Sequence, residues 1–484
     1  MIKLVKFSHN RDEDFKKSSD NLLDIINRFA DQPALTSLYA YFRKWYNLPE
    51  NVIKQGIKKR IANLYMYKKA KFDDSLKLKW ILMSFIKHLG LLLYALICSR
   101  WFFNVKNYRL IVDGIASKIE LLRFKKLIDL IGRDKVLIIT TYKTAKDEFK
   151  GYNIEYEKKF KHYNARDILY SFFYEIIFGV WLYLILSIRL NVNLILLMTP
   201  VINDYLKYSK LFSANKADYI VQERHYATNA VKNYLFKKNG GRASTCIQKN
   251  IIQLDAMYYY CDIDWFFSLG NRTADGLFEY GARIDKIIPV GSMFMEYYWF
   301  SNQEKVEKNL DIVMLGINVM NAYERMDSYS KFIDDYYDCI RWLVRFKNDY
   351  PSYRIAIKHH SSAGEDKIEE EIIASTGLEA VDKNANSYKI AFGSRCAVTY
   401  GSTMGYELNA HGILTFFLNP NKHSTILLDY NDKLLEGLNV ASYEIFRDKV
   451  LGILSGDNKV FINADDICIN SSIVSNRIYK ELVN

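Results

Sequence analysis

Short apolar runs alternate with amphipathic stretches along the chain from about residue 108 onward. The runs of the first series that predict strands are KVLIITT at 135, NLILLMT at 193, DYIVQER at 218, STCIQKN at 244, DWFFSLG at 264 and IIPVGS at 287. Between two of them, YATNAVKNYLFKKNGG has helical character and ends in the Gly-Gly typical of a helix stop. Strands that alternate with helices predict βαβ units and a parallel sheet.

A second series of the same kind follows the charged stretch at 296–309, which predicts a helix or a linker. Its predicted strands are DIVMLGIN at 311, RIAIKHH at 354, LEAVDK at 378, CAVTYGS at 396 and LTFFLNP at 414. We therefore predict an α/β fold with two Rossmann-like parallel-sheet domains, 108–300 and 301–484, that face a cleft. The last helix is expected to pack back on the first domain, and residues 1–107 are expected to form an extra, mainly helical region.

Two longer apolar stretches, at 80–103 and 176–188, raise the question of a membrane. The first contains Lys87 and His88, which are costly at a bilayer centre. The second is shorter than the roughly 20 residues that a spanning helix needs. Two interpretations stay open: helices that lie on a membrane surface with basic residues at anionic headgroups, or core helices of a large α/β domain.

Composition narrows the class of partner. The chain has 67 Lys and Arg against 55 Asp and Glu, so its net charge is +12, which suits an anionic partner. A nucleic-acid binder could stack bases on the Lys-Tyr stretch at 63–72. However, aromatic residues occur throughout the chain and no nucleic-acid-binding motif is found, so we expect no nucleic-acid partner.

The cysteines and the first residues bear on the compartment. Six scattered cysteines without a CxxC predict reduced thiols and no zinc site. The first twenty residues are too charged for a secretory signal. We expect a cytoplasmic protein, peripheral on the inner face of the cell membrane.

Chemistry-bearing residues gather where the predicted strands end, which is where open parallel sheets bind ligands. In AVTYGSTMGYELNAHG, Ser402 and Thr403 would begin a helix and hold a phosphate with hydroxyls and free N–H groups. Glu407, one turn further on, could reach a ribose hydroxyl. An ordinary helix cap with an incidental Glu is the alternative.

Other predicted strand ends carry cations and imidazoles. A pyrophosphate, or a leaving phosphate that needs a proton, suits the group Lys358, His359, His360 and Ser361. The first unit adds two clusters, namely Glu223, Arg224 and His225, then Gln248, Lys249 and Asn250. Clusters at strand ends in both units predict an active site in a shared cleft.

These motifs carry a resemblance. The runs IKHHSS and NSYKIAFGSRCAVTYGSTMGYELNAHGILTFFLNP resemble the second half of bacterial surface and capsular polysaccharide glycosyltransferases of the GT-B type. That family is related in plan to Kdo-transferases and polysialyltransferases. The stretch from IQKNIIQLD to IIPVGS is similar to the first half, and the likeness covers roughly residues 190–425. His360 stands where the family usually has Pro, so two histidines compete for one role.

The resemblance implies a donor site mostly in the second unit. Lys358 and His359, with His360 as a substitute, would contact the donor phosphate. The other implied donor contacts are Ser361, Ser387, Tyr388, Ser402, Thr403 and Glu407. An acceptor would enter from the first unit past Gln248, Lys249 and Asn250.

Acceptor activation needs a general base in the first unit. Glu223 and His225 are the candidates, with Asp255 behind them, although a salt-bridged structural acid is the alternative for Glu223. Together with His359 they are the expected catalytic residues.

Enzymes of the resembled type generally need no metal, so no metal or cofactor is expected. Asp262 and Asp264 spell DxD but precede an apolar run, so we interpret them as a turn at the start of a strand.

The expected function is transfer of a sugar from a nucleotide-activated donor to a surface polysaccharide or lipid-linked glycan. A CMP-linked sugar acid is the favoured donor, and a UDP- or GDP-linked hexose fits almost as well. The alternative is transfer of a polyol phosphate, as in CDP-glycerol glycerophosphotransferases of teichoic-acid synthesis.

Overall fold

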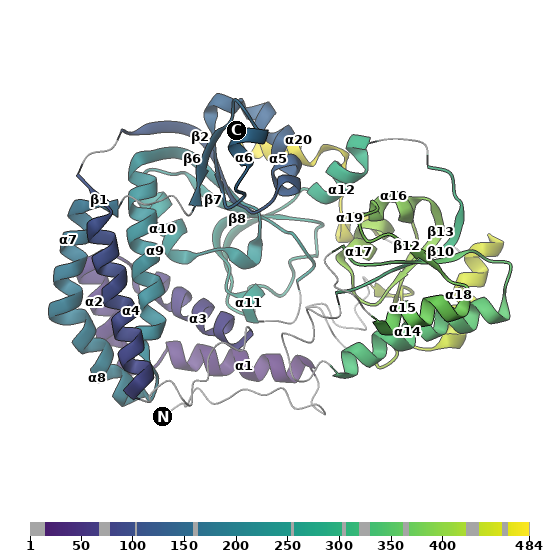
Figure 1. Ribbon diagram of the computed structural model, residues 1–484, viewed down its shortest axis with the longest axis horizontal. Helices are drawn as coiled ribbons and strands as arrows, with labels where there is room; N and C mark the ends of the chain where they lie inside the picture. The colour runs from purple at the N-terminus through teal and green to yellow at the C-terminus, as the bar shows by residue number, and fades with distance from the viewer. Residues whose placement is uncertain are drawn as a thin grey trace.

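The protein contains two parallel sheets that follow one another along the chain and lie side by side along its longest axis (Figure 1). This computed structural model describes residues 15–66, 78–101, 104–157, 163–252, 256–302, 306–318, 330–361, 367–422, 435–456 and 463–483. The predicted α/β fold, with two Rossmann-like domains and a helical N-terminal region, is confirmed. The division at residues 107 and 300 stays a prediction.

The first sheet has seven strands in the order β4-β3-β2-β6-β7-β8-β9, and every pair is parallel. The strands are β2 (Lys106–Ile115), β3 (Val136–Thr140), β4 (Asn153–Tyr156), β6 (Asn215–Gln222), β7 (Ala243–Ile247), β8 (Asp262–Ser268) and β9 (Arg283–Pro289). Every residue of β3 and β7 is buried. Helices cover both faces of a parallel sheet, so its strands are continuous apolar runs without alternation.

The second sheet has six parallel strands in the order β12-β11-β10-β13-β14-β15. They are β10 (Leu310–Leu315), β11 (Ile355–Lys358), β12 (Glu379–Val381), β13 (Ser394–Thr399), β14 (Thr415–Leu418) and β15 (Asn439–Val440). In both sheets the first strand lies inside, and the chain later returns to its other side. The strand order therefore reverses between β2 and β6 and between β10 and β13, and such switch points open crevices for ligands.

Helices surround the sheets, and a small separate sheet pairs β1 (Ser99–Arg100) with β5 (Tyr163–Asn164). The helices of the first half are α1 (Phe15–Ala30), α2 (Thr36–Tyr46), α3 (Glu50–Met66), α4 (Leu78–Ile97), α5 (Lys118–Ile131), α6 (Ala145–Glu148), α7 (Ala165–Tyr174), α8 (Val180–Leu190), α9 (Leu194–Ala214), α10 (Ala230–Lys238) and α11 (Ala256–Tyr259). The others are α12 (Met293–Tyr298), α14 (Ser330–Asp349), α15 (Lys367–Thr376), α16 (Ser387–Phe392), α17 (Thr403–Ala410), α18 (Tyr443–Ser455), α19 (Ala464–Ile467) and α20 (Val474–Val483).

Two sequence predictions in the first half were wrong. The run at 193 is not a strand, because Asn193 accepts a hydrogen bond from Leu196 N (3.2 Å) and so begins the 21-residue helix α9. A short apolar run cannot be distinguished from a buried helix by periodicity alone. The apolar stretch at 176–188 is also longer than predicted, because a π-helical turn (Glu175–Gly179) joins α7 and α8 into one 26-residue helix.

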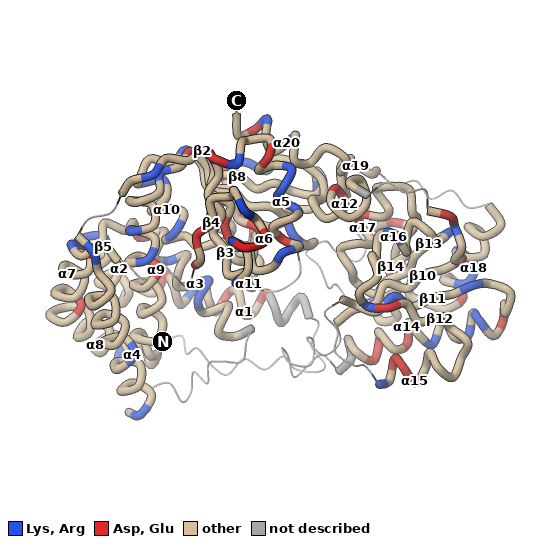
Figure 2. The backbone as a smooth tube through the Cα atoms, turned by 45° about the horizontal axis from the view of Figure 1, so that its top comes forward, with Lys and Arg blue, Asp and Glu red and all other residues tan. Residues whose placement is uncertain are grey.

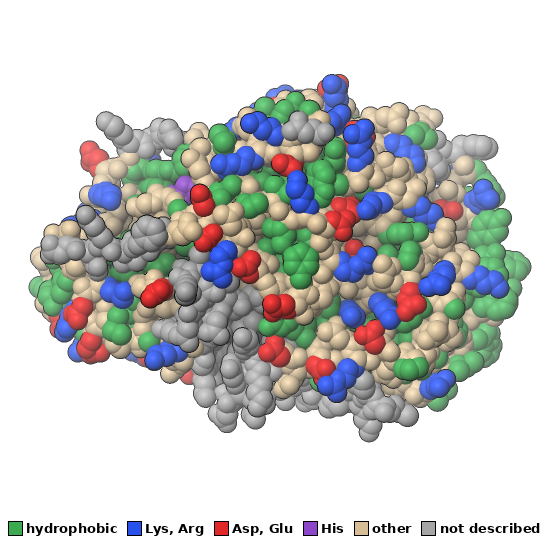
Figure 3. Space-filling view, turned by 180° about the vertical axis from the view of Figure 1, so that it is seen from behind, with side chains coloured by type: hydrophobic (Ala, Val, Ile, Leu, Met, Phe, Trp, Pro, Cys, Tyr) green, Lys and Arg blue, Asp and Glu red, His purple; other side chains and the backbone are tan. Residues whose placement is uncertain are grey.

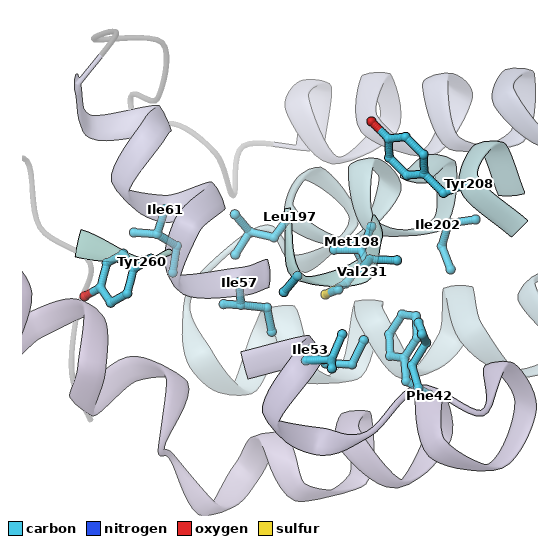
Figure 4. Close-up of a cluster of buried hydrophobic side chains, with 14 of the residues drawn as sticks. Phe42, Ile53, Ile57, Ile61, Leu197, Met198, Ile202, Tyr208, Val231 and Tyr260 are labelled. Atoms are coloured by element: carbon cyan, nitrogen blue, oxygen red, sulfur yellow. The ribbon is translucent and has the colours of Figure 1, made fainter. Parts of the chain in front are cut away.

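The N-terminal helices belong to the core of the first domain. Phe42 of α2 and Ile53 and Ile57 of α3 are fully buried, and they point toward Leu197 and Met198 of α9 (Figure 4). One buried hydrophobic cluster contains all five. The helical region that matched neither series in the sequence therefore packs on α9 and α10 and shares the core of the first domain.

The C-terminal segment returns to the first domain. Val474, Ile478 and Leu482 of α20 are buried in one cluster with Leu121 and Phe124 of α5. On the way back the chain passes very close to Gly291, whose φ is 95°. A Cβ atom at Gly291 would lie 2.8 Å from the carbonyl oxygen of Ile469.

We expect Gly291→Ala to destabilise the protein by about 2–4 kcal/mol, because it combines a left-handed backbone with a steric clash. Urea unfolding followed by circular dichroism would measure the change. The control is Gly90→Ala in α4, where no atom lies within 4 Å of the new Cβ. An equal effect of both substitutions would contradict the close approach.

Candidate active site

The carboxyl ends of the two sheets face each other. Ile251, which follows β7, donates a backbone hydrogen bond to Thr403 Oγ1 of α17 (3.1 Å). Ser292, which follows β9, donates its hydroxyl to Glu407 Oε1 of the same helix. Both bonds join the strand-end side of the first domain to the helix that follows β13 in the second.

An ion cluster occupies the switch point of the first domain. We call Glu120, Arg123, Glu223, Arg224 and Lys249 the ion cluster. Glu223 Oε2 accepts from Arg224 Nε (2.6 Å), and its Oε1 lies 3.0 Å from Lys249 Nζ and 3.3 Å from Arg123 Nη2. Charged residues are visible along α5, which carries Glu120 and Arg123 (Figure 2).

Glu120 anchors the cluster at the start of α5. Ser117 caps this helix by accepting from Glu120 N (3.3 Å), and Glu120 Oε2 accepts in turn from Ala116 N (2.6 Å). Burial raises the pKa of Glu120, but this backbone N–H together with Lys249 and Arg224 outweighs burial and holds the pKa below its usual value. The carboxylate is therefore charged at neutral pH and can hold both cations at the crevice.

Glu223 and His225 lie in surroundings unlike those of a general base. Glu223 is buried, and three cations contact its carboxylate. The ring of His225 is fully buried, its Nδ1 accepts from Lys249 N (3.3 Å), and burial lowers its pKa to about 3. Nε2 has no hydrogen-bond partner among the described residues. In this conformation, a base role for either residue would require rearrangement.

Of the remaining first-domain candidates, Gln248 is buried in a hydrogen-bond network and Asn250 is partly exposed. Gln248 is buried, and its side chain bonds Leu269 N (3.0 Å) and both Oγ1 and the carbonyl oxygen of Thr273 (2.9 and 3.0 Å). It therefore links β7 to the loop after β8. Asn250 is half-buried and supplies a carbonyl to Gln248 (3.2 Å). Asp255 lies outside the described residues.

The second switch point places α17 beside the end of β10. Ser402 caps α17 by accepting from Met404 N (3.3 Å), as the sequence indicated, and its own N–H bonds Thr399 Oγ1 (3.2 Å). Gly316 follows β10 and allows close packing, since a Cβ there would lie 3.0 Å from the carbonyl oxygen of Lys358. Strands β11 and β13 flank β10, so their ends are roughly 10 Å apart by normal strand spacing.

A buried carboxylate orients His359 at the end of β11. His359 Nδ1 lies 2.7 Å from Glu369 Oε1 of α15, and Tyr336 donates its hydroxyl to Glu369 Oε2 (2.9 Å). The His359 side chain is 23% exposed while that of Glu369 is 4% exposed. Because Nδ1 faces Glu369, Nε2 is the ring nitrogen left to meet a ligand.

Lys358 and its neighbours lie around this histidine. Lys358 Nζ is buried and donates to the carbonyl oxygens of His359 (2.7 Å) and Lys383 (2.9 Å), so it fixes the strand end. Burial lowers its pKa, although Asp382 opposes this effect. His360 and Ser361 are exposed, and Ser387 is half-buried at the start of α16.

Glu407 is an interdomain residue in this structure. Its carboxylate is buried and accepts from Ser292 Oγ on one oxygen and from Tyr388 OH (2.5 Å) on the other. Burial raises its pKa to about 7, against the opposing effect of these two donors and of Arg123. Contact of Glu407 with a donor ribose, expected from the sequence, would require these hydrogen bonds to open. Contact of the Tyr388 hydroxyl with the donor would require its bond to Glu407 to open.

The DxD residues are the first and third residues of β8, so they belong to the strand and not, as the sequence had suggested, to a turn before it. Asp262 pairs with Arg283 (3.0 Å), and Asp264 accepts from Ser244 N (2.7 Å). This places them at the edge of the sheet opposite the strand ends. Within the described residues, no group of three or more His, Cys, Asp or Glu side chains is arranged to hold a metal ion.

Sequence reasoning missed several residues that shape the site: Glu120, Arg123, Ser292, Tyr336 and Glu369. The Ser-x-x-Glu capping pattern at 117–120 would have marked the start of α5. No comparable signal singles out Glu369, because exposed Glu370 and Glu371 follow it directly. Only the tertiary structure shows which of the three faces His359.

No protein-family model and no curated protein matches the chain. Solved structures do match. S. aureus MnaA with UDP is 11% identical and covers 78% of this chain and 98% of its own, with a TM-score of 0.45. The wall teichoic acid polymerase TagF with CDPG is 11% identical, with 84% and 97% covered and a TM-score of 0.44. The lipopolysaccharide outer core galactosyltransferase WaaB is 10% identical, with 78% and 95% covered and a TM-score of 0.40. Identities and TM-scores this low carry no inference about activity.

Glu407 should make stability depend on pH. Its pKa is about 7 in the folded protein against a usual 4.5, so between these values the folded state binds more protons than the unfolded state. Stability should therefore fall by roughly 3 kcal/mol as pH rises through this range. Glu407→Gln should remove this component from urea-unfolding midpoints measured across the range. An unchanged slope in the variant would show that the carboxyl does not titrate there.

Proposed function

We propose that this chain is a glycosyltransferase that binds a nucleotide-activated donor at the second switch point and an acceptor beside the first. The observation that carries the proposal is His359, which faces Glu369 at the end of β11, next to β10 and therefore close to the second switch point. An imidazole held by a buried carboxylate is suited to bind or protonate a phosphate. The chain would belong among enzymes that build bacterial surface glycans.

The surroundings of His359 support an anionic donor. The N-terminal turn of α17 presents the hydroxyls of Ser402 and Thr403, which accept from Met404 N and Ile251 N and can each still donate to a phosphate oxygen. Across the interdomain contact, Lys249 and Arg224 of the ion cluster remain 17% and 31% exposed. Charged N–H donors and a helix start both stabilise the charge that develops on a leaving phosphate.

We assign acceptor activation to the first-domain side, with Glu223 and His225 as the proposed groups. Glu223 would act only after its cations shift, for instance when Arg224 and Lys249 turn toward a bound phosphate. That shift would free the carboxylate at the moment when both substrates are present. Without substrates, the same contacts hold the Glu223 carboxylate and the two cations in place.

A CMP-linked sugar acid is the first donor candidate, and calorimetric titration with CMP, CDP, UDP and GDP tests the choice. CMP binding that weakens about tenfold or more in His359→Ala would support the proposal, given the strength of a charged hydrogen bond. Lys367→Ala changes an exposed residue of α15 and serves as the control. UDP or GDP preference would indicate a hexose donor, and CDP preference a polyol-phosphate transferase. Absence of nucleotide binding would overturn the site.

Transfer assays distinguish the role of His359 from that of Glu369. His359→Ala should lower kcat by about a hundredfold or more, because the group that meets the leaving phosphate is lost. Glu369→Gln keeps the ring and should lower kcat by a smaller factor with KM nearly unchanged. Tyr336→Phe removes the hydroxyl that donates to Glu369 and keeps both Glu369 and His359, so it is the milder variant. If His359→Ala kept full activity, His359 would not take part in transfer.

A further inference from the structure

The solvent-facing side of α4 and of the α7–α8 helix is apolar, although exposed helix faces are usually polar. The outer surfaces of α4 and of the α7–α8 helix expose many large side chains. We call the following six the docking face: Trp80 (44% exposed), Ile86 (58%), Ile97 (83%), Phe173 (64%), Trp181 (63%) and Ile188 (78%). Figure 3 shows the hydrophobic edge on the right, at the end of the molecule formed by α4, α7 and α8 in Figure 1. Contiguous apolar surface of this kind marks an interaction site.

The inner side of the same helices carries a buried polar cluster among apolar residues. Glu175 is fully buried and accepts from the hydroxyls of Tyr41 (2.8 Å), Tyr46 (2.6 Å) and Tyr183 (3.0 Å). His88 of α4 lies 3.0 Å from the other Glu175 oxygen and 2.9 Å from Thr199. Polar groups that are satisfied inside, beneath an apolar exterior, are the arrangement expected of a surface that meets lipid.

Length and composition alone would allow both helices to cross a membrane. The most hydrophobic 18-residue stretches of the two helices are only 22% and 39% buried, which is low for core helices. Charges argue against a crossing. Lys87 is exposed near the middle of α4, and Lys44 lies beside Trp45, whose ring stacks on Tyr174 (4.0 Å) near the middle of α7–α8. A crossing would bring these cations near the bilayer centre, where charges are costly.

The charge around the docking face fits anionic lipid. Within the described residues 78–101 and 165–190, the exposed charged side chains are Lys79, Lys87, Arg100, Arg166 and Arg189, all of them cations. Basic residues that surround an apolar face are typical of helices lying in the plane of an anionic membrane surface. Long basic side chains can keep their ammonium groups among headgroups while the helix faces the acyl chains.

We propose that α4 and the α7–α8 helix dock in the plane of a bilayer that contains anionic lipid, with the docking face in contact with the acyl region. The packing against α2 and α9, and the contacts of Glu175, hold both helices to the folded core. The second domain then lies at the far end of the molecule from the membrane (Figure 1). This inference does not depend on the proposed transferase activity.

Flotation of the full-length chain with vesicles of phosphatidylcholine, with and without phosphatidylglycerol, tests the proposal. We expect binding to be strongest with phosphatidylglycerol and to weaken with salt. The double variant Trp181→Glu/Ile188→Glu should lower the partition coefficient about tenfold or more. Ile445→Glu, a substitution at a 46% exposed apolar residue of α18 in the second domain, is the matched control. Lys87→Glu/Arg189→Glu should reduce binding only to the anionic vesicles.

Other outcomes would overturn the proposal. No flotation with either vesicle, or equal flotation of the docking-face variant, would exclude lipid as the partner. Retention in the membrane after an alkaline carbonate wash would show a spanning arrangement. A dimer that Trp181→Glu converts to a monomer, without vesicle binding, would assign the face to a second copy of the chain. If the Glu variants fail to fold by circular dichroism, Trp181→Ala/Ile188→Ala replaces them, with the same reduced partition expected.

Discussion

The buried carboxyl of Glu407 is the contact on which the relation of the two domains depends. One oxygen meets Ser292 at the end of the first domain, and the other meets Tyr388 of the second. The same helix, α17, begins at Ser402 beside the second switch point. Any shift of α17 would therefore change the interdomain contact and the second switch point together.

The C-terminal crossing secures this arrangement. His411 Nδ1 donates to the carbonyl oxygen of Glu407 (2.7 Å), and its Nε2 accepts from Ser471 N (3.1 Å), so the ring is neutral. Burial lowers the pKa of His411 and so favours the neutral ring. The hydrogen bond to the Glu407 carbonyl opposes this effect without outweighing it. Gly270 and Gly291 let the returning chain pass within contact distance of the first domain. The last helix then packs on α5, which carries Glu120 and Arg123 of the ion cluster.

Two polar clusters in the first domain serve different purposes. The ion cluster lies at the strand ends with Arg224 and Lys249 partly exposed, and is therefore suited to meet an anionic ligand. The cluster around Glu175 is closed to solvent and carries three tyrosine hydroxyls and the imidazole of His88, with no Lys or Arg among these contacts. It lies beneath an apolar exterior, where no water is available to compete for its hydrogen bonds. Its role is to hold α4 and α7–α8 to the core in a fixed orientation.

Strand positions were predictable because buried parallel strands are apolar on both faces. Runs such as RIAIKHH at 354 and CAVTYGS at 396 correspond to β11 and β13. The same reasoning wrongly predicted a strand at 193, because Asn193 caps a helix there and the apolar segment continues as α9. The strand-end position of His359 was also visible in sequence. Its partner Glu369 was not, because nothing local distinguishes it from Glu370 and Glu371.

The sequence by itself determined the two-domain α/β plan, the strand-end clusters and the cap at Ser402, because these follow from local periodicity and capping chemistry. Only the tertiary structure decided what each charged group faces. Glu223 is surrounded by cations, His225 is enclosed by aromatic rings, and Glu407 is turned into the interdomain contact. The burial of a side chain and the groups that it contacts depend on residues distant in the chain. Burial and contacts in turn set the charge and the accessibility of that side chain.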